Sequence, residues 1–457
     1  MKTTRRQFAG AAAGAFVAFS AAAEKEASGE KPKDDTAALQ ERIDQNHLLE
    51  LEPGTYRLTK PLVLNTTRTG YAGIRGPQGT ARLVMAGPGP AVRVVGDHLG
   101  TADPGSVEPH TWNEERFPVL SGFEIVGEHP EADGIELLRT MQPVIERVLI
   151  RQCRHGIRLA ERNRNVIIAN CQIYDNAETG IFIDNCNLHQ MNITGNHISY
   201  CKRAGIHQLN GDVHNIQITG NDIEYNAGME DVLSGEIVLE AADGGMISEY
   251  TIASNTIQAR PKHSGANVAV VRGEKDGSVG LFAITGNVLG SRNVNLLVRN
   301  AHGGMTISGN AIYTGVEGNV VVEQSSNVLL TGNTVRPSSE SGPDFGDRGG
   351  VRFADCDGCL VSDNIIVTRA NGEKPGGSIS LIGCRAVSAS GNQILRVHHR
   401  GVYLEDCKQC RVVGNTIMPQ DGCEDFIAVA AEGQNESNVL RDNFPCGTPA
   451  ANSVQAD

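Results

Sequence analysis

Two carboxylates and a histidine stand at neighbouring places in three successive repeats: Asp184, His207 and Glu240. Two carboxylic acids roughly 6.5–9.5 Å apart, one protonated and one ionised, are what an inverting glycoside hydrolase needs. A histidine between them could tune one carboxylate or act as the general base. Arg158 and Glu236 lie nearby in the pattern and are candidate substrate contacts. The competing interpretation is that all of these are ordinary polar residues on an exposed sheet.

A short repeat must position these residues. The pair Gly-Asn, or a Ser-Asn or Asp-Asn variant, recurs with its asparagine at positions 196, 221, 255, 287, 310, 333, 364, 392, 415 and 443. The shortest spacing is 23 residues, and the longer spacings indicate insertions. Each unit also holds a period-two apolar segment such as Gly180-Ile181-Phe182-Ile183, which predicts a short strand with one buried face.

Two or three short strands per 23-residue unit, joined by Gly-Asn bends, predict the coils of a parallel β-helix. Glycine and asparagine tolerate the positive φ of such a bend. Coils stack about 4.7–4.9 Å apart, so each asparagine should hydrogen-bond to its equivalents above and below. We therefore predict that the recurring Gly-Asn pair is architectural. Only 4% of the 457 residues are aromatic and 53 are glycine, which also favours a repeat protein over packed globular domains.

Aligning the Gly-Ile strands gives two outward rows. The first is predicted to contain Arg158, Phe182, His207, Val238, Ala269, Leu297, Val321, Arg352, Ser380 and Tyr403. The second is predicted to contain Ala160, Asp184, Leu209, Glu240, Val271, Arg299, Glu323, Ala354, Ile382 and Glu405. Arg352 and Tyr403 are therefore further candidate substrate contacts.

Long turns could form the walls of a groove beside these rows. Segment 96–117 carries His110 and the only tryptophan, Trp112, which could stack on a sugar or close the core. Asp344, Asp347 and Arg348 form a charged loop that could bind a cation.

Eleven cysteines are present, and several follow the repeat. Cys186, Cys356, Cys384 and Cys407 occupy one column, and Cys153, Asn176, Cys201 and Asn226 another. The two C-x-x-C pairs that begin at Cys356 and Cys407 are thus predicted to be small stacked residues rather than a zinc site. We expect no metal or cofactor, except that a lyase would need a cation such as Ca²⁺ to neutralise a uronate.

The N-terminus predicts export. Arg5-Arg6-Gln7-Phe8 precedes an apolar run that ends at Ala23, typical of a bacterial twin-arginine signal and of a periplasmic or secreted protein. No later run is long enough to span a bilayer. Removal of residues 1–23 takes away Lys2, Arg5 and Arg6 and no acids, so the formal charge changes from −13 to −16. Such a charge argues against nucleic acid or anionic lipid as the partner, and it weakens the case for a polyanionic substrate unless a cation bridges the two.

One further pattern allows a resemblance to be named. Asp34-Asp35-Thr36-Ala37-Ala38-Leu39-Gln40, followed by Leu51-Glu52-Pro53-Gly54-Thr55-Tyr56, resembles the N-terminal opening of the pectate-lyase-like superfamily. The resemblance implies an all-β, single-stranded right-handed parallel β-helix with an N-terminal helical cap. With this fold, we expect the chain to consist of a signal at 1–23, a cap and first coils at 24–120, repeats at 121–445 and a tail at 446–457. The R-x-P-x-x-R pattern of pectate lyases and the D-P-H-D pattern of alginate epimerases are absent.

The fold hosts many activities, so it does not define function. The first hypothesis is an exported enzyme that cleaves a polysaccharide, as a glycoside hydrolase or as a lyase in which Lys202, Arg203 and His207 supply the base and the cationic groups. The alternative is a non-catalytic glycan-binding or structural β-helix. A third hypothesis is a fructan-processing transferase with carboxylates at a subunit interface. The sequence leaves the sugar, the linkage and the oligomeric state open.

Overall fold

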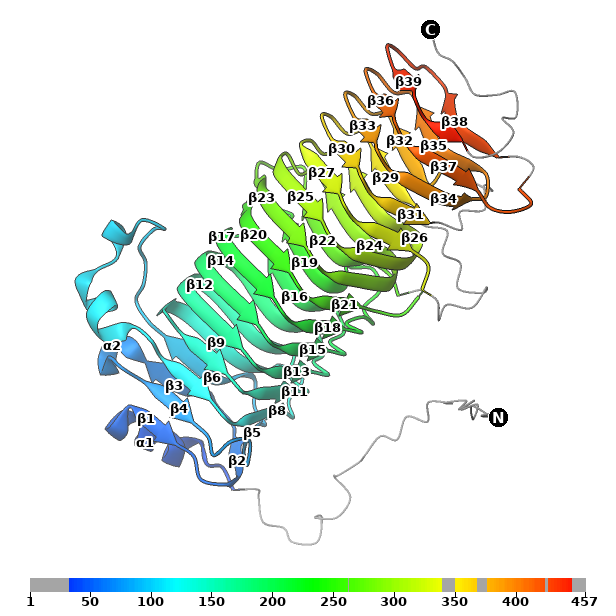
Figure 1. Ribbon diagram of the computed structural model, residues 1–457. Coiled ribbons are helices and arrows are strands. Elements are labelled where there is room, and N and C mark those ends of the chain that lie inside the picture. Colours follow the sequence, from blue (N-terminus) through cyan, green and yellow to red (C-terminus); the bar gives the residue numbers. More distant parts are fainter. Residues whose placement is uncertain (1–32, 262, 339–349, 368–375, 424–425, 446–457) are drawn as a thin grey trace, which may run out of the picture. The chain divides into compact units, whose positions relative to one another are not determined.

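The computed structural model describes residues 33–261, 263–338, 350–367, 376–423 and 426–445. The predicted export signal and the loop acids Asp344 and Asp347 lie outside these residues. Asp34–Asp457 forms one compact unit, a right-handed parallel β-helix of about 14 turns (Figure 1). The predicted fold is confirmed. In the described part of the chain, no helix is long and apolar enough to cross a membrane.

Each coil contributes one strand to each of three faces, and equivalent strands of successive coils pair in parallel. The first face contains β1 (Leu48–Glu50), β4 (Gly73–Arg75), β7 (Val119–Ser121), β10 (Val144–Glu146), β17 (Asp212–Thr219), β20 (Met246–Ala253), β23 (Ser278–Thr285), β25 (Gly303–Ser308), β27 (Val328–Thr331), β30 (Leu360–Ser362), β33 (Ser388–Ser390), β36 (Arg411–Val413) and β39 (Val439–Arg441). The second face contains β2 (Gly54–Leu58), β5 (Ala81–Met85), β8 (Glu124–Gly127), β11 (Leu149–Arg151), β13 (Gln172–Tyr174), β15 (His197–Ser199), β18 (Asp222–Glu224), β21 (Thr256–Gln258), β28 (Thr334–Arg336), β31 (Ile365–Val367), β34 (Gln393–Val397), β37 (Thr416–Pro419) and β40 (Phe444–Pro445).

The third face contains β3 (Leu62–Asn65), β6 (Gly89–Val95), β9 (Ala132–Met141), β16 (Ala204–Leu209), β19 (Gly235–Ala241), β22 (Ala266–Arg272), β29 (Val351–Ala354), β32 (Ile379–Ile382), β35 (Arg400–Glu405) and β38 (Ile427–Glu432). Four long strands turn a corner and serve two faces. β12 (His155–Ala169) and β14 (Thr179–Thr194) run from the third face to the first, and β24 (Val288–Arg299) and β26 (Ala311–Glu323) run from the second to the third.

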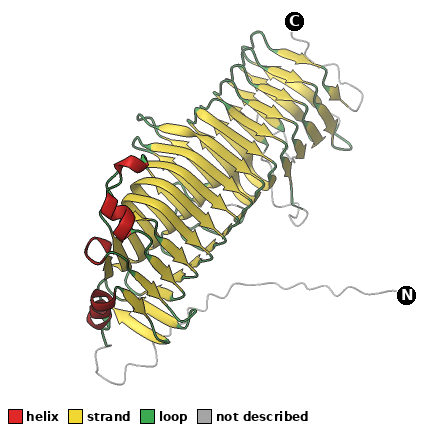
Figure 2. Cartoon of the chain, turned by 60° about the vertical axis from the view of Figure 1, so that its left-hand side comes forward, coloured by secondary structure: helices red, strands yellow, loops and turns green. Residues whose placement is uncertain are grey.

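The N-terminal helix α1 (Thr36–Asn46) covers the open end of the first coil. Its Leu39 and Ile43 join the apolar core. The Gln40 side chain accepts a hydrogen bond from Val63 N at 2.8 Å and donates one to Val63 O at 3.0 Å. The helix thus partners part of the backbone of β3, which would otherwise be an unpaired edge. The predicted helical cap is present; Figure 2 shows the helices in red and the strands in yellow.

The recurring asparagines form one continuous hydrogen-bonded ladder at the bend between the first and second faces. Asn287 is typical: its amide donates to Ile252 O at 2.9 Å and to Asn310 Oδ1 at 3.0 Å. Its Oδ1 accepts from both the backbone and side-chain nitrogens of Asn255 at 3.0 Å. The residue before each asparagine has a positive φ, including the non-glycines Ser254, Asp363 and Asp442. The predicted architectural role of the motif is confirmed.

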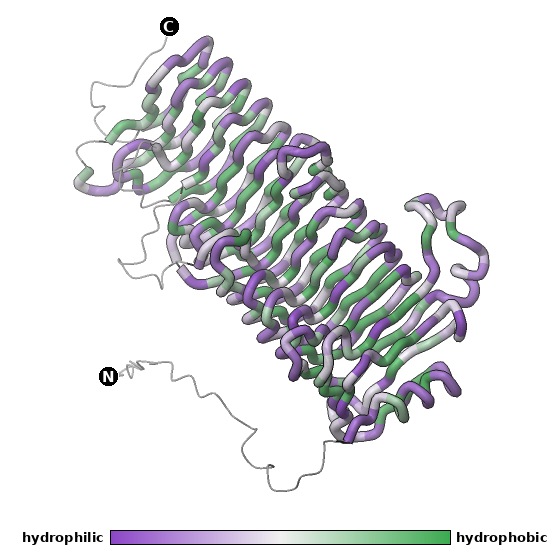
Figure 3. Tube along the Cα trace, turned by 180° about the vertical axis from the view of Figure 1, so that it is seen from behind, coloured by the Kyte–Doolittle hydropathy of each residue, from purple (hydrophilic) through white to green (hydrophobic). Residues whose placement is uncertain are grey.

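The cysteines stack as predicted. Cys153 N donates to Asn176 Oδ1 at 3.0 Å, and Cys201 N donates to Asn226 Oδ1 at 3.0 Å. The ten cysteines that the structure describes are free thiols, and all but Cys423 are buried. Burial raises the pKa of the Cys153 thiol to about 12, which keeps it protonated and unreactive. Apolar residues fill the interior, and hydrophobic and hydrophilic positions alternate along the coils (Figure 3).

The ladder predicts a large cost for losing one asparagine. Asn287→Leu removes the side-chain partners of Asn255 N and Ile252 O, while Asn310 Oδ1 keeps its bond from the backbone N of residue 287. Each buried polar group left without a partner costs about 1–3 kcal/mol, so the free energy of unfolding should fall by at least about 2 kcal/mol in chemical denaturation. Asn113→Leu, at an exposed position, is the control and should change it by less than about 0.5 kcal/mol. Equal stability of the two variants would contradict the ladder.

Candidate functional site

The predicted rows of the third face are correct in register. Arg158 pairs with Phe182, Phe182 with His207, and His207 with Val238, and the row continues in this way to Tyr403. The second row places Asp184 and Glu240 on either side of Leu209. The sequence-predicted residues of this face therefore do lie on adjacent strands.

The first part of the third face carries a ladder of alternating charges. Arg158 donates to Glu136 at 2.5 Å and to Asp184 through two nitrogens, at 2.5 and 3.0 Å. Arg93 forms a further ion pair with Glu136. Asp184 is thus paired with the cation of the preceding coil.

His207 and Glu240 do meet. His207 Nε2 lies 2.7 Å from Glu240 Oε2, and Arg203 approaches the same oxygen at 3.3 Å. The ring of His207 stacks on Phe182 with centroids 5.2 Å apart. Burial lowers the pKa of His207, an effect that Glu240 partly opposes, so the imidazole is neutral near pH 7. The structure thus brings Glu240 and His207 together but pairs Asp184 with Arg158 instead.

Glu236 takes part in a wholly buried ion pair. It lies 2.9 Å from Arg292, and both side chains have zero exposure. Asn226 N donates to Glu236, while Arg292 donates to Asn226 O, Ser234 Oγ and Ser264 O. Burial raises the pKa of Glu236, and Arg292 opposes that shift. The pair ties two lengthened turns to the corner between the second and third faces.

The expectation that this face forms an open groove is wrong for several of its residues. His207 and Tyr403 are fully buried although they point away from the core, and Glu236 is covered by the turns that Arg292 joins. Tyr403 is contacted by Glu405 and Glu432, each 3.1 Å from its hydroxyl. Alternation of side chains defines which face a residue takes, but the turns that fold over that face decide its exposure.

The remaining predicted contacts lie apart from each other. Arg352 is half exposed and is paired with Glu323 on the third face. Trp112 is half-buried in a short helical turn, η2 (Thr111–Glu115), of the segment before β7. Neither residue lines the two hollows described below.

The buried ion pair generates a stability prediction. Glu236→Gln keeps the shape of the side chain but leaves the Arg292 charge buried without an anion. Breaking a buried pair in this way costs about 3–5 kcal/mol, which should appear as a lower free energy of unfolding in chemical denaturation. Glu274→Gln, at an exposed acid, is the matched control. A loss below about 1 kcal/mol in Glu236→Gln would show that water reaches Arg292.

His155 generates a pH prediction. Burial lowers its pKa to about 4, so it is neutral in the folded protein, while the unfolded chain takes up a proton near pH 6.5. The unfolded state therefore binds more protons between these values, and stability should fall as the pH drops from 6.5 to 4, by about 3 kcal/mol for this residue.

His155→Phe keeps a ring against Phe182, whose centroid lies 4.8 Å away, but cannot be protonated. Urea denaturation at pH 7 and pH 4 should therefore show a smaller acid-induced loss in this variant than in the parent. The exposed His302→Gln variant should lose as much as the parent. An unchanged pH dependence in His155→Phe would contradict a neutral His155.

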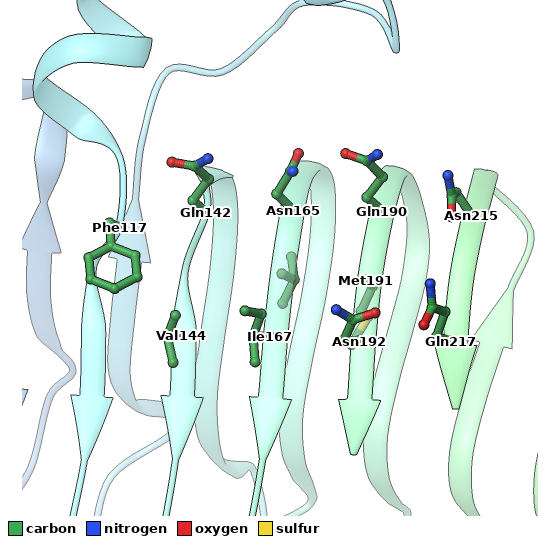
Figure 4. Close-up of a pocket in the computed structure, with 11 residues that line it drawn as sticks. Phe117, Gln142, Val144, Asn165, Ile167, Gln190, Met191, Asn192, Asn215 and Gln217 are labelled. Carbon is green, nitrogen blue, oxygen red and sulfur yellow. The ribbon is translucent and has the colours of Figure 1, made fainter. Parts of the chain in front are cut away.

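The hollow that best fits an extended ligand lies on the first face. It has a volume of about 370 Å³, and Figure 4 shows the side chains that line it. Four amides stand in a row at the corner of successive coils: Gln142, Asn165, Gln190 and Asn215 (Figure 4). Each has a positive φ between 54° and 67°, which shapes this corner. A second row on the strands below them contains Val144, Ile167, Asn192 and Gln217, which are register partners.

A second hollow of about 680 Å³ continues the first and shares Asn215 with it. It follows the same two rows over β20, β23, β25 and β27, from Glu249 and Thr251 to Asn327 and Leu329. The exposed ring of Phe117 stands at the other end. We call the two hollows together the amide groove. It crosses nine strands, from β7 to β27, a distance of about 38 Å at the spacing of a sheet.

The amide groove is almost uncharged. Of the residues that line it, only Glu249 carries a charge. This surface was not predicted from the sequence, because its side chains are amides and apolar groups rather than titratable residues. One signal was available in the sequence: Asn192, Gln217 and Thr251 each stand three positions before the Gly or Ser of a Gly-Asn or Ser-Asn bend, where an outward polar residue repeats.

Two clusters in the described part of the chain have the residue types for a metal. His197, Asp222 and Glu224 lie on the second face, where His197 already pairs with Asp222 at 3.2 Å and Ser199 at 3.0 Å. The other cluster is Asp97, His110 and Glu115, in the segment that ends at Phe117. Neither contains a cysteine, in keeping with the predicted role of the C-x-x-C pairs as stacked residues.

Comparison with known proteins gives one family and several structural neighbours. A family model described as "Right handed beta helix region" matches residues 118–223, 235–417 and 297–455. The A-module of mannuronan C-5 epimerase AlgE6 from Azotobacter vinelandii has a TM-score of 0.44 at 14% identity, over 93% of this chain and 98% of that one. The Dettilon tailspike protein has a TM-score of 0.45 at 14% identity, over 87% and 65%.

A third neighbour is the catalytic unit of an α-1,3-glucanase of family GH87 from Streptomyces thermodiastaticus. Its TM-score is 0.36 at 12% identity, over 93% of this chain and 68% of that one. No curated protein matches the chain by sequence.

Proposed function

The chain belongs to the right-handed β-helix family, and from this premise we propose that it binds a linear, uncharged polysaccharide or oligosaccharide along the amide groove. The observation that carries the proposal is the double row of outward side chains, with amides in both rows, that repeats once per coil. A polymer presents similar groups at regular intervals, and this surface does the same.

The chemistry of the groove fits hydroxyl groups. A side-chain amide offers two N–H donors and a carbonyl acceptor, so it can pair with a hydroxyl in either orientation. Asn192 and Gln217 are exposed, and neither makes a hydrogen bond within the described part of the protein that would have to be broken. Between the amides, the exposed faces of Phe117, Ile167 and Leu281 offer apolar surface to the C–H faces of a sugar.

Charge argues for an uncharged ligand. The chain has a formal charge of −13, and the groove contains Glu249 but no lysine or arginine among its lining residues. A uronate or sulfated polymer would meet repulsion here with no cation to offset it. The preference for a neutral glycan therefore follows from the same residues that form the groove.

Cleavage of the bound glycan is a second hypothesis, and one contact favours it. The Glu240 side chain is partly exposed and hydrogen-bonded to the neutral His207, which suits a carboxylate that exchanges protons. Under this hypothesis Asp184 and Glu240 are the acid and base, on the third face, and each would have to act beside a cation. Binding at the amide groove does not require it.

Removing two neighbouring amides should weaken glycan binding. The double variant Gln190→Ala, Asn192→Ala removes one amide from each row of a single coil. Loss of two hydrogen bonds of about 1 kcal/mol each predicts roughly 10–30-fold weaker binding, measured by isothermal titration calorimetry with soluble neutral glucans, mannans, galactans and fructans. Gln172→Ala, an exposed amide on the second face of the same coil, is the control. Tighter binding of polyuronates than of every neutral polymer would contradict the proposal.

The same polymers test cleavage separately. If the protein is a hydrolase, new reducing ends should appear, and Asp184→Asn and Glu240→Gln should each lower kcat by about 10²–10⁴-fold with little change in affinity. Ultraviolet absorbance from an unsaturated product would instead report a lyase. If a substrate is cleaved and both variants keep more than half of the activity, the third face is not the catalytic site.

A further inference from the structure

The segment between β6 and β7 contains a cluster that the proposed function does not use. It leaves the third face after Val95, forms the short turns η1 (Pro104–Ser106) and η2, and returns at Phe117 to the end of the amide groove. Asp97 stands near its start and Glu115 near its end, and His110 lies between them in sequence. The loop and its helical turns project beside α2 (Thr66–Thr69) in Figure 1.

The three side chains converge on one point. One ligand atom from each of Asp97, His110 and Glu115 lies within 4.8 Å of the other two. His110 Nε2 is 2.7 Å from Asp97 Oδ2 and 3.4 Å from Glu115 Oε1. A single imidazole nitrogen therefore faces two carboxylates that come from the two ends of the segment.

Glu115 is fixed in place with one oxygen unused. Its side chain is 3% exposed, and its Oε2 accepts hydrogen bonds from Asp97 N at 3.0 Å and Thr66 Oγ1 at 3.3 Å. Within the described part of the chain, its Oε1 is buried and has no hydrogen-bond partner, and the nearest donor is His110 Nε2 at 3.4 Å. The oxygen points at a second carboxylate and an imidazole, so a cation held between the three groups would satisfy it.

We propose that Asp97, His110 and Glu115 bind a divalent cation of the first transition series, with Zn²⁺ as the reference ion. One imidazole nitrogen and two carboxylate oxygens suit Zn²⁺ or Mn²⁺, whereas Ca²⁺ takes oxygen ligands only. The cation would satisfy Glu115 Oε1 and neutralise the facing carboxylates in one step.

The geometry needs only a small adjustment. Ligand atoms about 2.0–2.1 Å from a tetrahedral zinc ion lie roughly 3.3 Å apart. The contact between His110 and Glu115 already has this separation, and the contact between His110 and Asp97 must lengthen by about 0.6 Å. The His110 and Asp97 side chains are 47% and 40% exposed, so the imidazole has room to move and water can complete the coordination.

The site would act on the segment rather than on the core. A cation bound to positions 97 and 115 joins the two ends of the loop that carries Phe117, and Thr66 of α2 supports the same carboxylate. The proposal stands on the cluster itself and does not depend on which ligand the amide groove takes.

The test is direct titration of the full mature chain, stripped with chelator, with Zn²⁺ and Mn²⁺ by isothermal titration calorimetry, together with the thermal midpoint. We expect one ion per chain and a higher Tm in its presence. His110→Ala, at an exposed position that should not affect folding, should weaken binding by more than the roughly 10–100-fold that loss of an outer-shell group causes. Glu115→Gln should do the same, and Glu114→Gln, its exposed neighbour, is the matched control.

Two results would overturn the proposal. One is no saturable binding of either ion to the parent protein, in which case the carboxylates share a proton instead. The other is binding that His110→Ala and Glu115→Gln leave unchanged, since the ion would then sit elsewhere. Circular dichroism of each variant shows whether a loss of binding comes from unfolding, and His110→Ala keeps the test valid if Glu115→Gln does not fold.

Discussion

The buried asparagine ladder is the interaction on which the rest of this protein depends. Each coil must leave the first face and enter the second through a sharp bend, and that bend turns backbone groups toward the interior. From Asn196 to Asn443, an asparagine side chain satisfies them and also bonds the asparagine of the next coil, as Asn287 does with Asn255 and Asn310. Because the ladder has the spacing of the strands, it fixes the register of the three faces in these coils. The ladder inside these coils thus aligns the rows of side chains on their outside.

Whether an aligned row of side chains is covered or open depends on the turns beside it, and this differs between the third face and the first. On the third face, the turns that carry Ser234 and Ser264 are drawn inward by Arg292, and charged residues pair along the row, as Arg158 does with Glu136 and Asp184. This covers or neutralises most of the groups that could react. On the first face, the corner residues adopt positive φ and carry amides, so the strands below them lie at the bottom of an open groove. The third face carries most of the residues that could react, and the groove on the first face contains a single charged residue, Glu249.

This division explains what could be predicted from sequence. The register of the strands could be predicted from the period of the Gly-Asn pairs and the alternation of Ile181 and Ile183. Both outward rows of the third face were predicted correctly. Exposure could not be predicted, because it depends on which side chains and turns cover an outward position. His207 points outward and is fully buried, with Phe182 stacked on its ring and Glu240 bonded to it. The Asp97 cluster was missed because its members come from one irregular segment with no repeat, so nothing in their spacing predicts that they meet.

The contrast also bears on how an acidic β-helix can present a neutral surface. A formal charge of −13 would repel many ligands if it were spread evenly. Here arginines of the third face form ion pairs with neighbouring acids. These pairs lie away from the amide groove, so they contribute little to the electrostatic potential there. The side-chain amides of the amide groove need no counter-ion. Asn192 and Gln217, for example, keep their donors and acceptors available for a ligand. The charged residues of the third face thus pair with each other and stabilise that face. The amide groove on the first face is left suited to an uncharged, hydroxyl-rich chain.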